Sequence, residues 1–128
     1  MSEQFEYPDQ DDAAVLVRRL GFHVRDAGLL ASALDRPRQV VWGVEAYVGL
    51  HAKAAALLDA ISRAHPCIDG NKRLAWILVR RFYDLNGYVL TGSDDPVEVD
   101  RFIREVAGGH LELGSIAGWL AARTTSKR

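Results

Sequence analysis

Two apolar helical segments that flank one short polar loop constrain this chain most. In the first segment, Gly49 to Ala64, the apolar residues recur at helical spacing on one face, so that Lys53 and Arg63 are expected to face away from it. The second segment, Asn71 to Asn86, is apolar around most of its circumference and ends at Gly87. A helix of that kind is buried on most sides. We therefore predict that segment 71–86 is the central buried helix of the fold.

The loop between these helices carries residues that suit phosphate chemistry. Lys72 and Arg73 fall in the first turn of the second helix, where the positive end of the helix dipole disfavours each by about 0.3–1 kcal/mol. The pair makes sense if an anion binds there, because the free N–H groups and both cations would converge on a phosphate. His65 could accept a proton near neutral pH, and Asp69 is a hard oxygen ligand of the kind Mg²⁺ prefers. A purely structural His65 at the end of the first helix is the alternative.

Composition and charge narrow the class of protein. A chain of 128 residues with 48% hydrophobic and 26% charged residues is typical of one globular domain, here spanning 1–128. The formal charge of −1 argues against broad binding of nucleic acids or anionic membranes. No apolar run reaches transmembrane length, and no secretory signal pattern opens the chain. One cysteine allows no internal disulfide, which fits a reducing compartment, and we expect a cytoplasmic protein.

The remaining patterns add helices and hardly any strand. Further helices are predicted at about 11–20, 26–34, 96–107 and 113–122, with a polar turn at 91–95. Asp26 is a candidate helix cap, and Phe22 a candidate apolar position beyond the first helix. Residues 1–10 and 124–128 are polar and expected to be loosely ordered. The fold class is therefore all-α, a compact helical domain with one short extended segment at about 39–43.

Three stretches of the chain resemble the Fic/Doc family. The loop His-Pro-x-x-Asp-Gly-Asn-Lys-Arg is similar to the family's signature loop, residues 25–34 to its early helix, and residues 50–58 to the helix that leads into the loop. The resemblance spans about residues 15–120. Lys72 points to the Doc (death-on-curing) branch, because Fic adenylyltransferases usually carry Gly there and a second Arg where this chain has Trp76. The resemblance implies the Fic/Doc helical fold.

The resemblance also implies a role for each loop residue. His65 matches the general base that deprotonates a target hydroxyl, and Asp69 matches the Mg²⁺ ligand. Nucleotide and phosphate binding fall to the residues that open the second helix, Gly70, Asn71, Lys72 and Arg73. Cys67 stands where the family usually has Phe. Cys67 could anchor the loop as a small buried residue, with a reactive thiol as the weaker alternative.

The implied function is that of the toxin of a toxin–antitoxin pair. With ATP and Mg²⁺ as cofactors, such an enzyme moves the γ-phosphate to a protein hydroxyl, the family target being translation elongation factor Tu. The alternatives are AMP transfer on the same scaffold and a catalytically silent helical protein that binds a partner. The expected partners are an antitoxin whose C-terminal helix occupies a groove and the protein target.

The extended segment leaves two interpretations open. In the Fic/Doc fold the corresponding region is a flap that holds a target segment by strand-like pairing. Val40, Val41 and Trp42 are then candidate target contacts. Alternatively, Trp42 is a core or lid residue.

Overall fold

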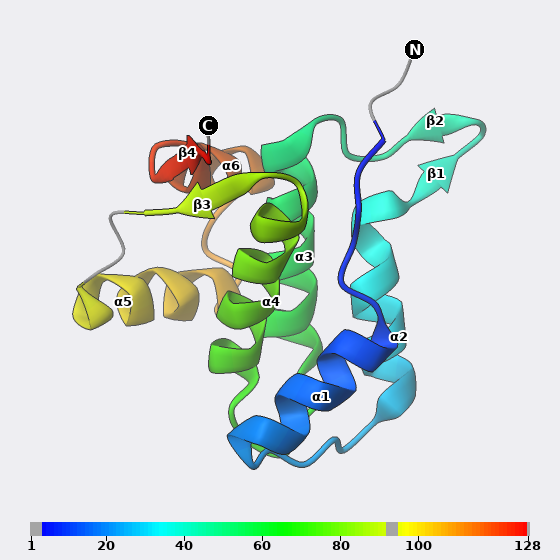
Figure 1. Cartoon of the computed structure of the whole chain (residues 1–128), viewed down its shortest axis with the longest axis vertical. Coiled ribbons are helices and arrows are strands. Elements are labelled where there is room, and N and C mark those ends of the chain that lie inside the picture. The colour runs from blue at the N-terminus through cyan, green and yellow to red at the C-terminus, as the bar shows by residue number, and fades with distance from the viewer. Residues whose placement is uncertain (1–3, 92–94, 128) are drawn as a thin grey trace.

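The computed structural model of the chain describes residues 4–91 and 95–127 and is mostly helical (Figure 1). Its α-helices are α1 (Gln10–Leu20), α2 (Ala27–Asp35), α3 (Leu50–Ala64), α4 (Asn71–Leu85), α5 (Pro96–Ala107) and α6 (Leu113–Ala121). The 3₁₀ turn η1 (Arg36–Arg38) follows α2, and the short strands are β1 (Val40–Val41), β2 (Val44–Glu45), β3 (Tyr88–Leu90) and β4 (Thr124–Ser126). The predicted fold class is confirmed, and the helix bounds agree within a residue or so. Most of the predicted turn at 91–95 lies outside the described residues.

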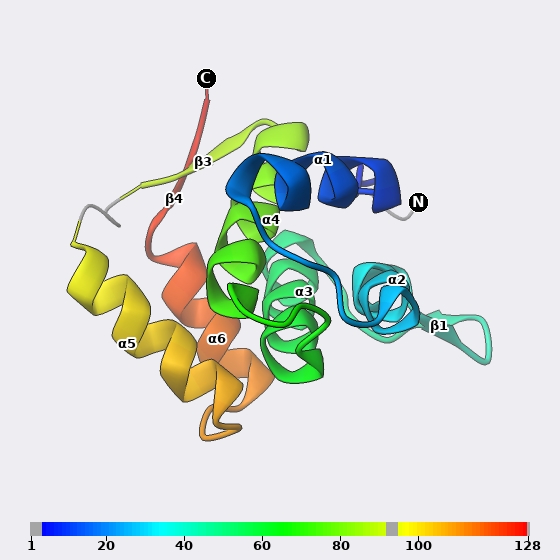
Figure 2. The same cartoon turned by 90° about the horizontal axis from the view of Figure 1, so that it is seen from below.

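The antiparallel pair α3 and α4 forms the centre of the molecule, with α2 on one side and α5 and α6 on the other (Figures 1 and 2). The apolar stripe of α4, which includes Leu74, Leu78 and Phe82, is fully buried. Its opposite face carries exposed charged residues such as Arg80 and Arg81. Burial of α3 is more complete, since every residue from 53 to 62 is buried. The central position expected for segment 71–86 is therefore shared with α3.

Lys53 in α3 is buried in the protein core, so the expectation that it faces away from the apolar side of this helix was wrong. Its side chain is 1% exposed, and its Nζ donates to the carbonyl of Tyr47 at 2.8 Å and to that of Pro37 at 3.4 Å. It also forms an ion pair with Glu45 at 3.1 Å. A buried ammonium is stable only when it is paired and hydrogen-bonded. Lys53 therefore ties the chain before and after the β1–β2 hairpin to α3.

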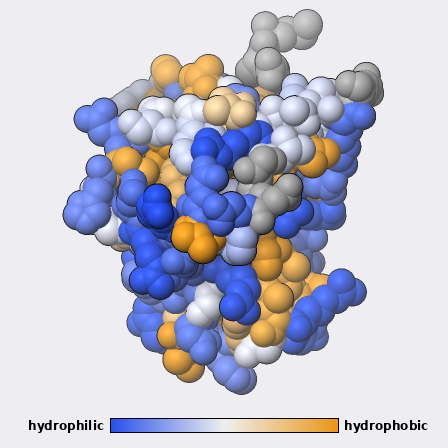
Figure 3. Space-filling model, turned by 90° about the vertical axis from the view of Figure 1, so that its left-hand side faces the viewer, coloured by the Kyte–Doolittle hydropathy of each residue, from blue (hydrophilic) through white to orange (hydrophobic). Residues whose placement is uncertain are grey.

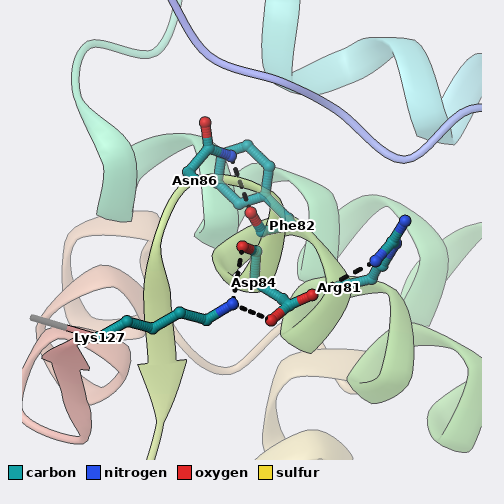
Figure 4. Close-up of polar contacts among 5 residues, drawn as sticks. All are labelled: Arg81, Phe82, Asp84, Asn86 and Lys127. Atoms are coloured by element: carbon teal, nitrogen blue, oxygen red, sulfur yellow. Dashed lines mark hydrogen bonds and ion pairs between the residues drawn. The ribbon is translucent and has the colours of Figure 1, made fainter.

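The described residues at both chain ends contact the helical body of the protein. Thr124–Ser126 pair antiparallel with β3, and the Lys127 ammonium forms an ion pair with Asp84 at the end of α4 (Figure 4). Asn86 Nδ2 donates to the carbonyl of Phe82 in the same corner, at 2.8 Å (Figure 4). Near the N-terminus the ring of Tyr7 stacks on Phe82, with 5.6 Å between centroids. Both polar segments therefore take part in long-range packing, and the looser order expected for chain ends stays a prediction.

None of the helices in the described part of the chain is long and apolar enough to cross a membrane.

Replacing Lys53 tests how much its buried contacts stabilise the β1–β2 hairpin. Lys53→Met keeps the volume but leaves the carbonyls of Pro37 and Tyr47 without their buried donor. We expect the free energy of unfolding to fall by about 1–3 kcal/mol. Amide exchange in residues 40–45 should also accelerate. The control is Lys127→Met, which breaks a solvent-exposed pair and should cost much less. Equal losses for the two variants would contradict the account.

Candidate functional site

The candidate site is the α3–α4 connection, residues 65–70, at the lower end of the molecule in Figure 1. Figure 2 views it end-on, between α5 and the α1–α2 connection. His65 ends α3 in a left-handed conformation with φ of 51°, which is uncommon for a residue other than glycine. Its side chain is exposed. Backbone strain of this kind is frequent at functional sites.

Asn71 holds the loop in shape. Its Oδ1 accepts from the backbone N–H of Cys67 at 2.8 Å, and its Nδ2 donates to the carbonyl of Cys67 at 2.9 Å. Both polar ends of this buried amide are therefore used inside the protein. The Asn71 side chain folds the loop back onto the start of α4. A role of Asn71 in phosphate binding stays a prediction.

The α1–α2 connection braces the other side of the loop. The backbone N–H groups of Arg25 and Asp26 both donate to the carbonyl of Pro66, at 2.7 and 3.1 Å, and the Arg25 guanidinium reaches the carbonyl of His65 at 2.6 Å. Asp26 also caps α2 by accepting from the N–H of Leu29 at 3.1 Å. The contact between Arg25 and His65 joins residues forty positions apart, and sequence reasoning missed it. A sequence signal that points toward it is the resemblance of residues 25–34, which begin at Arg25, to the early helix of the Fic/Doc family.

Gly70 directly precedes α4, in a conformation and a space that favour glycine. Its φ is 77°, and a Cβ added there would lie 2.5 Å from the ring of Phe22. The Phe22 ring in turn lies under Arg73, with 5.8 Å from the guanidinium carbon to the ring centroid. Phe22 therefore supports the start of α4.

Cys67 is a buried loop residue. Its side chain belongs to the hydrophobic core, and its backbone forms an isolated bridge with Val24. Burial, together with the nearby carboxylate of Asp69, raises the pKa of the Cys67 thiol. A buried thiol with a raised pKa is a poor nucleophile, which argues against the reactive-thiol alternative.

The start of α4 is electropositive and opens into two adjoining cavities. Their volumes are about 520 and 460 Å³, and both are lined by Gly70, Asn71 and Lys72. Arg73 lines the first cavity, and His65 lines the second. Hydrogen bonding within α4 begins at Leu74, whose N–H donates to the carbonyl of Gly70 at 2.9 Å. The N–H groups before it are those that a helix start leaves available for an anion.

A nucleotide with Mg²⁺ fits the donor set around this site. Asp69 is exposed in the loop directly before Gly70, but it lines neither of the two cavities. Among the described residues, no group of three or more His, Cys, Asp or Glu side chains could hold a metal. Mg²⁺ usually binds one or two carboxylates and completes its shell with waters and substrate phosphates. The Asp69 carboxylate, which directly precedes the start of α4 in the chain, is a ligand of the type that such a site uses.

The hairpin residues lie apart from this site. Val40, Val41 and Trp42 are exposed near the N-terminal end of α3, whereas His65 follows its C-terminal end (Figure 1). With 15 residues, α3 is about 22 Å long, and the hairpin and His65 lie toward its opposite ends. The core interpretation of Trp42 is wrong, because its side chain is 97% exposed.

Substituting Gly70 should reveal how tightly the loop is packed. Gly70→Ala combines a positive φ with a clash against Phe22, whereas Gly87→Ala has a similar φ of 84° and nothing within 4 Å of the new Cβ. We expect Gly87→Ala to lose about 1–2 kcal/mol of unfolding free energy. Gly70→Ala should lose at least about 1 kcal/mol more, because of overpacking. Chemical denaturation measures both, and equal losses would contradict the close contact.

Comparison with known proteins agrees with the geometry. Residues 3–83 match the sequence model of the Fic/DOC family, a region that includes α1 to α3, the loop and most of α4. The chain is also 41% identical, over 119 residues, to a protein of Mycolicibacterium smegmatis (strain ATCC 700084 / mc(2)155) named Toxin Doc. That alignment covers 91% of this chain and 92% of the relative. The chain therefore belongs to the Fic/DOC family.

Proposed function

We propose that this protein is a toxin that transfers the γ-phosphate of ATP to a hydroxyl group of a target protein. The observation that carries the proposal is that His65, Lys72 and the start of α4 line one open cavity. A base, cations and free N–H donors around one space are what phosphoryl transfer requires. Membership of a family of ATP-using transferases supports this, as does the similarity to a relative named Toxin Doc.

His65 would act as the general base in this reaction. Its ring accepts the proton of the target hydroxyl as that oxygen attacks the γ-phosphorus. The bond from the γ-phosphorus to the bridging oxygen of the β-phosphate breaks, and ADP leaves with that electron pair. Lys72, Arg73 and the N–H groups of α4 stabilise the charge on the phosphates. Mg²⁺ bound at Asp69 would neutralise further phosphate charge.

AMP transfer is the competing chemistry on the same scaffold. In that reaction the target hydroxyl would attack the α-phosphorus instead, and pyrophosphate would leave. Lys72 favours phosphate transfer, because the resemblance places glycine at this position in the enzymes that transfer AMP. A catalytically silent protein that only binds a partner is the remaining alternative.

The hairpin is the proposed docking site for the target. Trp42 and Gly43 both have positive φ, the pattern of a type I′ turn, in which Asn-Gly is strongly preferred. A bulky, fully exposed Trp at such a position is an outlier, and this points to a role outside the fold. A cleft of about 1010 Å³ between α2 and α3 extends from Gln39, before β1, to Ala64, before His65. A target segment bound along this cleft could extend from the hairpin to His65, the proposed base.

An antitoxin is the second proposed partner. A groove of about 500 Å³ between α1, α4 and β3 is lined by apolar residues, including Leu16 and Ile77, and by charged residues at its edges. Such a groove suits the apolar face of an amphipathic helix. On the side of the molecule shown in Figure 3, hydrophobic residues gather in an area bordered by hydrophilic ones.

A target in the translation machinery, such as elongation factor Tu, would place the activity in the cytoplasm.

Mass spectrometry tests the proposed reaction. Wild-type protein and His65→Ala are incubated with ATP, Mg²⁺ and elongation factor Tu, then with a cytosolic extract. We expect a gain of one phosphate on a target in the wild-type reaction, reduced at least about 100-fold in His65→Ala because general-base catalysis is lost. A gain of one AMP would support the competing chemistry. No modification of any protein would favour the silent alternative.

The role of Trp42 can be separated from its effect on stability. Trp42→Asn creates the Asn-Gly turn, so we expect stability to be kept or slightly raised. If the ring contacts the target, KM for the protein target should rise several-fold while KM for ATP stays unchanged. Val48→Ala, at another exposed apolar residue outside the hairpin, is the control. Unchanged target kinetics in Trp42→Asn would contradict the docking role.

A further inference from the structure

Arg104 on α5 lies across the cavity from the start of α4. This cavity of about 460 Å³ is lined by His65, Gly70, Asn71 and Lys72 on one side and by Arg104 and Ala107 on the other. The side chain of Arg104 is exposed, so its charged end is accessible to a ligand. The cavity that contains the proposed base is thus bordered by cations from two helices.

Asp100 positions both of these cations, Arg104 and Lys72. Its Oδ2 accepts from Arg104 Nε at 2.7 Å, and its Oδ1 lies 3.7 Å from Lys72 Nζ. The hydrogen bond from Arg104 is the main reason why the pKa of Asp100 is lowered, so its carboxylate stays ionised near neutral pH. One carboxylate therefore holds an arginine of α5 and a lysine of α4 around the same space.

The terminal nitrogens of Arg104 remain available in this arrangement. Among the described residues, the structure records a hydrogen bond to Asp100 from Nε alone. A guanidinium fixed through Nε still presents its two terminal nitrogens, whose geometry matches phosphate oxygens. The cavity shared with His65 and Lys72 is the space next to them.

We propose that Arg104 is a further phosphate-binding residue of this site, contacting the polyphosphate of ATP from the side opposite α4, with Asp100 as the positioning residue. The inference rests on the proposed function, because it takes ATP as the ligand. Residue 104 lies beyond the region matched by the family model, residues 3–83. The assignment therefore comes from the packing of α5 against the start of α4, and it adds a binding residue to those of the signature loop.

The test compares two arginines of the same helix. Arg104→Ala removes the proposed contact, and Arg101→Ala makes the same change in charge at an exposed position that does not line the cavity. Binding of a non-hydrolysable ATP analogue with Mg²⁺ is measured by calorimetry, and KM and kcat are measured for transfer. We expect Arg104→Ala to raise Kd and KM for the nucleotide about tenfold, the scale of a charge-assisted hydrogen bond, with a smaller change in kcat. Arg101→Ala should stay within twofold of wild type.

Two further measurements separate contact from structure. Arg104→Lys keeps the charge but loses the planar fork, so its Kd should fall between those of wild type and Arg104→Ala. Thermal unfolding of Arg104→Ala should match that of Arg101→Ala, because both side chains are exposed. Equal Kd values for Arg104→Ala and Arg101→Ala would overturn the inference. Failure of the analogue to bind the wild-type protein would also overturn it.

Failure of the proposed function gives a different result. If the analogue binds and Arg104→Ala weakens its binding, but no target is modified, the nucleotide contact is supported and the proposed transfer reaction is contradicted. If transfer occurs and depends on His65 but not on Arg104, the proposed reaction is supported and the contact between Arg104 and the nucleotide is contradicted.

Discussion

The two hydrogen bonds between the Asn71 side chain and the Cys67 backbone fix the shape on which the site depends. They close the loop against the first residue of α4 at 2.8 and 2.9 Å. Gly70, pressed against Phe22, lets the chain enter the helix at a positive φ. Because these contacts are made by the Asn71 side chain and the Phe22 ring, the N–H groups at the start of α4, together with Lys72 and Arg73, stay available for an anion.

Local sequence patterns predict the helices and the loop well, because both depend on neighbours in the chain. The apolar spacing of residues 49–64 and 71–86 predicts α3 and α4 within a residue, and the turn chemistry of residues 65–70 predicts where they are joined. The cationic pair Lys72 and Arg73 at a helix start predicts an anion site from charge alone. The residues expected to form the candidate site, from His65 to Arg73, lie together in the structure because they are close in sequence.

Features that depend on distant partners were not predictable in this way. Lys53 looks like a surface residue in its helix, yet its Nζ has three oxygen partners on the segment 37–47. Thr124–Ser126 look like a polar tail, yet they pair with β3. The hydrogen bonds by which Asn71 closes the loop were not predicted for a related reason, since they are visible only in three dimensions. The contacts of Arg25 with His65 and of Asp100 with Lys72 likewise join separate elements.

The central claim is that the start of α4 is the phosphate-binding part of the molecule. Backbone amide chemical shifts, followed by NMR while ATP and Mg²⁺ are titrated into the protein, test it most directly. We predict saturable shifts that are largest at the amides of Asn71, Lys72 and Arg73, because an anion there accepts hydrogen bonds from those N–H groups. Saturable shifts centred elsewhere, for example in the cleft between α2 and α3, would contradict the account, as would no shifts at all.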